Sequence, residues 1–213
     1  AEAGTRARDE LRSGVEAAIE ALGAGFVAHP ACTALRQRLR TGELSTFDYY
    51  RQLLRLIYRL LFLFVAEDRN LLHPPGAGDP EQRRYARYYS LSRIRTLAGR
   101  RRGGPHPDLW RSLTVVFDGL GRSDGIPDLG LPGLGSFLWS PAACPDLDRS
   151  QIANQHLMTA IRRLGFVEDR TEKVLRPVDY RNLGTEELGA IYESLLEQHP
   201  DVNADAGAFR LNT

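Results

Sequence analysis

The clearest chemistry that this sequence offers is the binding of phosphate by arginine. Guanidinium groups neutralise phosphates and release counterions, so each contact adds to a salt-sensitive affinity for nucleic acid. Three tyrosines, at positions 85, 88 and 89, alternate with the arginines and could stack on bases or pack beneath the guanidinium groups. Between residues 83 and 102 the chain has no acidic residue and eight arginines, our candidate nucleic-acid contacts: Arg83, Arg84, Arg87, Arg93, Arg95, Arg100, Arg101 and Arg102. The alternative is a solvated helix face whose arginines pair with acidic residues elsewhere.

The overall charge balance hides this stretch. The formal net charge of the 213 residues is +1, with 27 arginines and a single lysine, Lys173, among the 28 basic residues. Because the stretch from Arg83 to Arg102 carries eight positive charges, the rest of the chain has a net charge of −7. The sequence therefore predicts an acidic body with one basic segment.

Motifs for methyl transfer and for phosphate-loop chemistry are missing from the sequence. An amino-methyltransferase holds the exocyclic amine of a base in a polar-Pro-Pro-aromatic loop. The single Pro-Pro here lies in His-Pro-Pro-Gly at residues 73–76, which is typical of a helix-breaking turn. No Gly-rich loop follows a predicted strand, where it could cradle a methionine-derived cofactor or a dinucleotide. We therefore predict no catalytic and no cofactor-binding residue in this chain.

Metal sites are not predicted either. Common restriction nucleases use an acid followed by an acid-x-Lys motif, so that carboxylates hold Mg²⁺ and the lysine orients the attacking water. Lys173 is the only lysine, and Thr171 rather than an acid stands two residues before it. His29 and Cys32 have the spacing of a zinc half-site, but no second pair completes it.

One strongly apolar segment predicts a central, nearly buried helix. Ser45 is a good N-cap, and Asp48 stands three residues later as a shortened capping box. Apolar residues then cover most of the helix circumference as far as residue 65. Its polar stripe consists of Arg51, Arg55 and Arg59, for which we expect internal ion pairs.

The remaining elements follow from apolar periodicity and from breakers. We expect amphipathic helices over residues 5–28, 31–39 and 79–99, one that begins at Pro105 or Pro107, one capped near Asp148 that runs to Leu164, and one from Thr185. Residues 165–167 and 173–175 predict a small hairpin around the turn at 168–172. The segment at 119–135 is rich in Gly and Pro and predicts an irregular connector.

These elements predict a mostly α fold: an irregular multi-helix domain around a central buried helix, with at most one small β-hairpin. We assign residues 1–200 to this helical scaffold or connector domain and residues 201–213, which are small and polar, to a linker. The longest apolar run, residues 60–66, is too short to cross a membrane. Two cysteines are too few for a disulfide framework. We therefore expect a cytoplasmic protein with no membrane partner.

Two segments resemble a known family. Residues 49–62, YYRQLLRLIYRLLF, with Ala-Glu-Asp-Arg at 66–69, resemble the helix upstream of the catalytic domain in large fused restriction-modification and phage-exclusion proteins, which are adenine-specific DNA methyltransferases. Residues 178–197, VDYRNLGTEELGAIYESLLE, resemble the Leu-Gly-x-Ile-Tyr-Glu helix that lies just before that domain, and residues 88–91 fit between the two. The resemblance covers about residues 26–197.

The resemblance implies a parent protein that flips adenine out of duplex DNA and transfers a methyl group from S-adenosylmethionine to its N6 position. In the family, the cofactor and catalytic motifs lie downstream of the second helix. The resemblance therefore carries no catalytic residue to any position here, and S-adenosylmethionine is expected in a downstream domain rather than in this chain. What it implies for this chain is the helical region that leads into the methyltransferase domain and that in some relatives joins it to a nuclease.

Our interpretation is a non-catalytic helical domain of such a methyltransferase, which positions the catalytic domain of the same polypeptide and contacts the backbone of duplex DNA. The first alternative is a free-standing helical protein-interaction module that does not bind nucleic acid. The second is an enzyme whose site is assembled from scattered His and Asp residues, for which the mark would be a pocket with several perturbed titratable groups.

Overall fold

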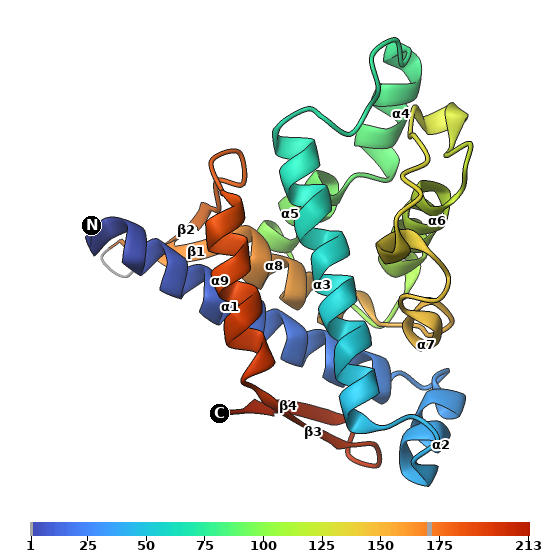
Figure 1. The fold of residues 1–213 in the computed structure, drawn as a ribbon, viewed down its shortest axis with the longest axis vertical. Coiled ribbons are helices and arrows are strands. Elements are labelled where there is room, and N and C mark those ends of the chain that lie inside the picture. The colour runs from blue at the N-terminus through green and yellow to red at the C-terminus, as the bar shows by residue number, and fades with distance from the viewer. Residues whose placement is uncertain (1, 170–171) are drawn as a thin grey trace.

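Helix α3, Thr46–Asp68, runs through the middle of the molecule in the computed structural model (Figure 1), which describes residues 2–169 and 172–213. Its N-terminus is capped as the sequence predicts, because Ser45 Oγ accepts a hydrogen bond from the Asp48 amide at 3.0 Å. Buried residues occupy most of its length, from Tyr49 to Ala66. The predicted central helix is confirmed.

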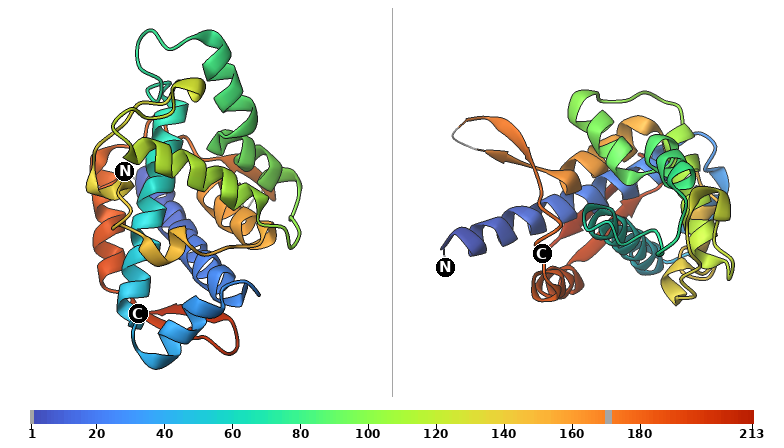
Figure 2. Two further views of the ribbon diagram at one scale, coloured as in Figure 1. Left: turned by 90° about the vertical axis from the view of Figure 1, so that its right-hand side faces the viewer. Right: turned by 90° about the horizontal axis from the view of Figure 1, so that it is seen from above.

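The other elements surround α3 in chain order. Figures 1 and 2 show them as mostly helical layers with two small antiparallel strand pairs, which confirms the predicted mostly α class. They are α1 Glu2–Ala28, α2 Thr33–Thr41, α4 Asp79–Tyr88, α5 Leu91–Arg100, α6 Asp108–Gly121, the 3-10 turns η1 Pro127–Leu129 and η2 Phe137–Trp139, α7 Pro145–Asp148, α8 Asn154–Gly165, β1 Phe166–Asp169, β2 Val174–Pro177, α9 Thr185–Leu196, β3 His199–Asn203 and β4 Ala208–Asn212.

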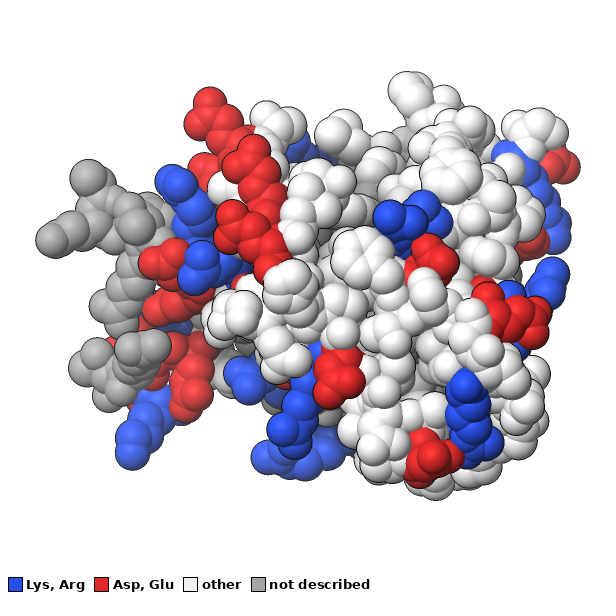
Figure 3. Space-filling model, turned by 60° about the horizontal axis from the view of Figure 1, so that its bottom comes forward, with Lys and Arg blue, Asp and Glu red and all other residues white. Residues whose placement is uncertain are grey.

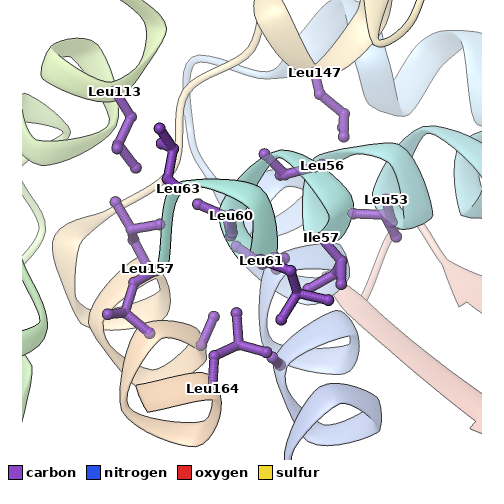
Figure 4. Packing of buried hydrophobic residues seen from close by; sticks show 14 of the residues in the cluster. Leu53, Leu56, Ile57, Leu60, Leu61, Leu63, Leu113, Leu147, Leu157 and Leu164 are labelled. Carbon is purple, nitrogen blue, oxygen red and sulfur yellow. The ribbon is translucent and has the colours of Figure 1, made fainter. Parts of the chain in front are cut away.

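Leucine side chains from several helices fill the core around α3. Figure 4 shows Leu60 and Leu63 on α3 facing Leu157 of α8 and Leu113 of α6, and all four are at most 1% exposed. Helix α1 packs closely on α8: a Cβ added at Gly14 would collide with the main-chain oxygen of Arg163. Removing this apolar surface from water is the main force that holds the layers together.

The segment at 79–99 forms two helices instead of the single predicted one. Ser90 caps the second helix, since its Oγ accepts a hydrogen bond from the Arg93 amide at 3.1 Å. The carboxylate of Glu67, near the end of α3, accepts from the amides of Leu91 and Ser92 at 2.9 and 2.8 Å and also from the Tyr85 hydroxyl at 2.7 Å. These bonds satisfy the free amides of a helix start, so the chain turns at Tyr89 and α4 and α5 take different directions.

The C-terminal residues form a second hairpin, where the sequence predicts a linker over 201–213. Strands β3 and β4 pair from His199 opposite Asn212 to Asn203 opposite Ala208. Phe209 is 4% exposed, and its ring lies 5.7 Å from that of Tyr49. The linker prediction is wrong because it weighed the small, polar residues and overlooked one aromatic that packs between α1 and α3.

Two other local predictions have different outcomes. The hairpin of β1 and β2 is confirmed, with Phe166 opposite Pro177, although residues 170–171 of its predicted turn lie outside the described residues. Helix α8 begins at Asn154 rather than at Asp148, which is instead the last residue of α7. Within the described part of the chain, no single helix is long and apolar enough to cross a membrane.

Candidate nucleic-acid interface

The structure divides the eight predicted arginines into three groups. The first lies on α4, the second on α5, and the third at the end of α5 and in the loop that follows it. Because the chain turns at Tyr89, α4 stands at the top of Figure 1 while α5 lies behind α3. The arginines therefore do not form one continuous patch.

The α4 arginines are exposed and belong to a separate surface. Arg84 donates a hydrogen bond to the main-chain oxygen of Asp128 in η1. The Arg87 guanidinium lies 5.3 Å from the centre of the Tyr88 ring, and that tyrosine is 52% exposed. Arg83 is exposed and makes no ion pair with any described residue. This group remains available to an anion, although two of its members have local partners.

Arg95 is a structural residue. Its Nε and Nη2 donate to the main-chain oxygens of Gly165 and Val178 at 3.0 and 2.5 Å. Its Nη1 lies 3.5 Å from a carboxylate oxygen of Asp68, and its side chain is 12% exposed. The guanidinium also lies 5.4 Å from the centre of the Phe64 ring. All three nitrogens have a partner inside the fold, so Arg95 serves the protein interior rather than a nucleic-acid surface.

Arg93 is half-buried on the same helix. Its Nε is buried and has no hydrogen-bond partner among the described residues. An unused donor of this kind is uncommon in a folded protein. Arg93 is therefore a secondary candidate for an anion contact.

The third group joins two arginines that the sequence analysis missed. Arg100, Arg101 and Arg102 are exposed where α5 ends. The loop after them lies along α8, because the Gln155 amide donates to the main-chain oxygen of Gly104 at 3.0 Å. That contact lies at the first turn of α8, whereas hydrogen bonds from Arg162 to the main-chain oxygens of Ala98 and Arg101 hold the end of α5 against the last turn of α8, which carries Arg162 and Arg163. We call these five residues the arginine cluster: Arg100, Arg101, Arg102, Arg162 and Arg163.

Arg162 connects the two helices and reports on the local field. Its Nε and Nη2 donate to the main-chain oxygens of Ala98 and Arg101 at 2.7 and 2.8 Å, which caps the C-terminus of α5. Burial lowers the pKa of Arg162, and the positive charges of Arg102 and Arg163 lower it further. Like charges therefore lie close together here, an arrangement that a bound anion would stabilise.

The elements that carry the arginine cluster contain no acidic residue. None occurs from residue 82 to 107, which covers α5 and the following loop, or from residue 149 to 167, which covers α8. Correspondingly, no arginine of the cluster forms an ion pair with a side chain of residues 8–169 or 172–213. In contrast, exposed arginines elsewhere do, such as Arg122 with Asp118 and Arg176 with Glu172.

The tyrosines of the basic stretch are largely committed to the core. Tyr85 is 2% exposed and donates its hydroxyl to Glu67, and Tyr89 packs against the core. Tyr88 is the exposed member of the three, and it lies on the α4 surface rather than beside the arginine cluster. The predicted interleaving of aromatic and basic side chains therefore does not produce a stacking platform at the cluster.

The prediction of internal ion pairs for the arginine stripe of α3 is confirmed for Arg59 and wrong for Arg51 and Arg55. Arg59 is 1% exposed and pairs with Asp148 at 2.9 Å. Arg51 makes a surface pair with Asp48 at 3.2 Å. Arg55 makes a different contact: it donates to the main-chain oxygen of Ala143 at 2.9 Å.

A cleft of ≈ 430 Å³ opens beside the Arg59–Asp148 pair, between Phe117, Trp139 and Asp118. Burial raises the pKa of Asp148, and the positive charge of Arg59 partly offsets this rise. The other nitrogens of Arg59 donate to the main-chain oxygens of residues 138 and 140. One perturbed carboxylate that is already held by a buried arginine does not make the set of groups expected for an assembled enzyme site.

His29 and Cys32, which have the spacing of a zinc half-site, have structural roles. His29 Nδ1 accepts a hydrogen bond from the Ala31 amide at 3.1 Å. Cys32 Sγ donates to the main-chain oxygen of Gln151 at 3.2 Å and accepts from its amide at 3.3 Å. No group of three His, Cys, Asp or Glu side chains that could hold a metal ion occurs among the described residues.

Comparison of the chain with protein-family models, with curated proteins and with solved structures gives no match. The features of this chain that bear on its function are therefore the arginine cluster and the resemblance of residues 49–62 and 178–197.

Proposed function

We propose that this chain is a non-catalytic helical scaffold that contacts the phosphate backbone of duplex DNA, and that it belongs to an adenine-specific DNA methyltransferase of a restriction-modification or phage-defence system. The observation that carries the DNA contact is the arginine cluster, in which five arginines from two packed helices and their loop have no acidic partner among the side chains that the structure describes. The resemblance of residues 49–62 and 178–197 carries the assignment to a methyltransferase.

The two segments that carry the resemblance lie side by side in the fold. The Tyr50 hydroxyl on α3 donates to the main-chain oxygen of Leu195 on α9 at 2.7 Å. The rings of Tyr58 and Tyr192 lie 5.7 Å apart. A stiff pair of helices is suited to holding a catalytic domain at a fixed position, because rigid elements position functional groups better than loops do.

In this proposal the arginine cluster fixes the position of the scaffold on DNA without reading its sequence. Guanidinium groups bind phosphate oxygens through paired hydrogen bonds, and such contacts set register and orientation. Arg162 is held by two main-chain oxygens, so it contributes charge, while Arg100, Arg101, Arg102 and Arg163 contribute free donors. S-adenosylmethionine and the reacting groups would belong to a methyltransferase domain of the same polypeptide, which acts in the cytoplasm.

The test is binding of the full chain to a fluorescent duplex at low salt, measured by anisotropy. Replacing Arg100, Arg101 and Arg102 with alanine should weaken binding by about tenfold to 100-fold, since each exposed charge contact contributes up to about 1 kcal/mol. A matched control replaces three exposed, acid-paired arginines, Arg40, Arg122 and Arg176. It removes the same charge and should bind nearly as the unmodified chain does. Equal losses in both variants would mean that total charge, not the cluster, governs binding.

A protein-interaction module remains the second candidate, and one surface favours it. The groove between α3 and α9 exposes Phe47, Tyr192 and Leu196 to solvent. Absence of any duplex binding in the anisotropy measurement would favour this candidate over DNA contact.

A further inference from the structure

The solvent-facing side of α3 and the adjoining side of α9 form an apolar trough. Phe47, Arg51, Arg55 and Tyr58 follow one another at steps of four, four and three residues, so they share one face of α3. Facing them on α9 are Tyr192 and Leu196. We call this surface the α3/α9 trough, and its hollow has a volume of ≈ 370 Å³.

The α3/α9 trough gathers three exposed large side chains on one surface. Phe47 is 49% exposed, Tyr192 42% and Leu196 56%. The Tyr58 hydroxyl is buried at the trough and has no hydrogen-bond partner among the described residues. Aromatic residues and arginine are also the types that are enriched in protein–protein interfaces and in their hot spots.

The two edges of the α3/α9 trough carry opposite charge. Arg51 and Arg55 form the basic edge on α3, where Arg51 makes an exposed pair with Asp48 and lies 5.0 Å from the centre of the Phe47 ring. The acidic edge consists of Glu186 and Glu193 on α9 and of Glu197, the residue that directly follows this helix. All three are exposed, and their spacing of seven and four residues places them on one face. Figure 3 shows a band of acidic side chains that an uncharged area separates from basic side chains on this side of the molecule.

The charges of the two edges lie at matching levels along the trough. Tyr50 bonds to Leu195 and Tyr58 packs on Tyr192, so residue numbers rise along α3 as they fall along α9. The turn of α3 with its arginines therefore lies at about the level of residues 193–197 on α9.

From this arrangement we infer that the α3/α9 trough binds a second copy of this chain. A two-fold axis that runs along the trough leaves each residue at the same position along the length of the trough. The same rotation places the basic edge of one copy opposite the acidic edge of the other. It therefore places Arg51 and Arg55 of each copy opposite Glu193 and Glu197 of the other, and it closes the apolar floors on each other. A surface that is complementary to itself under a two-fold axis is what an isologous dimer needs.

Nucleic acid does not fit this surface, because the acidic edge would repel phosphates. The α3/α9 trough also lies on a different side of the molecule from the arginine cluster. In Figure 1, α9 stands in front of α5 and α8. Figure 2, in its view from above, shows α9 and α5 on opposite sides of α3. The inference of a dimer therefore does not rest on DNA binding, and the dimer would leave both arginine clusters free.

Sedimentation equilibrium of the full chain over the micromolar range tests the dimer with two charge reversals. Arg51→Glu with Arg55→Glu makes both edges acidic, and Glu193→Arg with Glu197→Arg makes both basic. Each variant alone should self-associate about 100-fold more weakly than the unmodified chain, because like charges would face each other. Mixed in equal amounts, the two variants should form a heterodimer, since every opposed pair is then again of opposite sign.

Arg100→Glu with Arg101→Glu is the matched control, and it should dimerise as the unmodified chain does. If Arg55→Glu unfolds the protein, Leu196→Asp replaces it, because this side chain is 56% exposed and a charge on the floor should also give a monomer. A monomer at every concentration, or charge-reversed variants that dimerise like the unmodified chain, would overturn the inference. Binding of a different amphipathic chain to a monomeric protein would also overturn it.

Discussion

Arg95 and the arginine cluster belong to the same basic stretch of sequence, yet the structure assigns them opposite roles. We predict that Arg95→Ala destabilises the fold and leaves the DNA affinity of the folded protein unchanged. The Arg95 side chain joins the ends of α3 and α8 to the segment after β2, through Asp68, Gly165 and Val178.

The size of the effect follows from these contacts. Breaking a buried ion pair by removing one partner costs about 3–5 kcal/mol. Asp68 is 24% exposed in its side chain and lies 3.5 Å from Arg95, so water can solvate it after the change. The main-chain oxygens of Gly165 and Val178 would also lose charge-assisted bonds, each worth about 1.5–3 kcal/mol when made. Because these terms overlap, we expect a loss of about 3 kcal/mol in the free energy of unfolding.

Urea unfolding followed by circular dichroism measures this loss, and anisotropy measures duplex binding under native conditions. Arg95→Lys should cost less than Arg95→Ala, since lysine keeps the charge but cannot reproduce the planar fork that reaches two carbonyls. Arg100→Ala is the matched control and should change the free energy of unfolding by less than about 0.5 kcal/mol. A loss below about 1 kcal/mol for Arg95→Ala, or a loss of binding in its folded form, would refute the assignment.

Three further predictions concern the core and its pH dependence. Leu61→Ala, in the middle of α3, should cost about 2–5 kcal/mol in urea unfolding, and a cost under about 1 kcal/mol would mean that α3 is not central. Tyr58→Phe should not destabilise the protein, because the Tyr58 hydroxyl has no hydrogen-bond partner within the described chain. Tyr50→Phe should lower the free energy of unfolding by about 0.5–1.5 kcal/mol, because it loses the hydrogen bond to Leu195. Equal effects of the two changes would contradict the structure. Burial lowers the pKa of His156, so the unfolded state binds a proton at this residue more readily than the folded state does. The free energy of unfolding should therefore fall as the pH drops below about 6.5. If His156→Gln leaves this pH dependence unaltered, His156 is not its cause.

The central helix and its cap could be predicted from local sequence because their causes are local. The apolar positions of α3 are contiguous, and Ser45 caps a helix that begins one residue later. The break between α4 and α5 has a local signal, the Ser90 N-cap, that the sequence analysis missed, and a long-range cause that local sequence could not show. The long-range cause is Glu67, whose carboxylate accepts hydrogen bonds from the amides of Leu91 and Ser92. These two residues lie 24 and 25 positions further along the chain.

The candidate site shows the same division. Composition identified the basic stretch, but it could not separate Arg95, which is buried by α8 and β1, from Arg100, which is exposed. Arg162 and Arg163 join the cluster only because α8 packs on α5, a contact across some sixty residues of sequence. The sequence signal that could have identified them is that the segment over α8, like that over α5, lacks any acid.

The central claim is that the arginine cluster is a phosphate-binding surface, and the salt dependence of duplex binding tests it most directly. Each neutralised phosphate contributes about −0.9 to the slope of log K against log salt concentration, so neutralisation by the five positive charges of the cluster gives a slope of about −4.5. Replacing Arg100, Arg101 and Arg102 with alanine should bring the slope to about −1.8. A slope that is unchanged by these replacements, or near zero in the unmodified chain, would contradict the account.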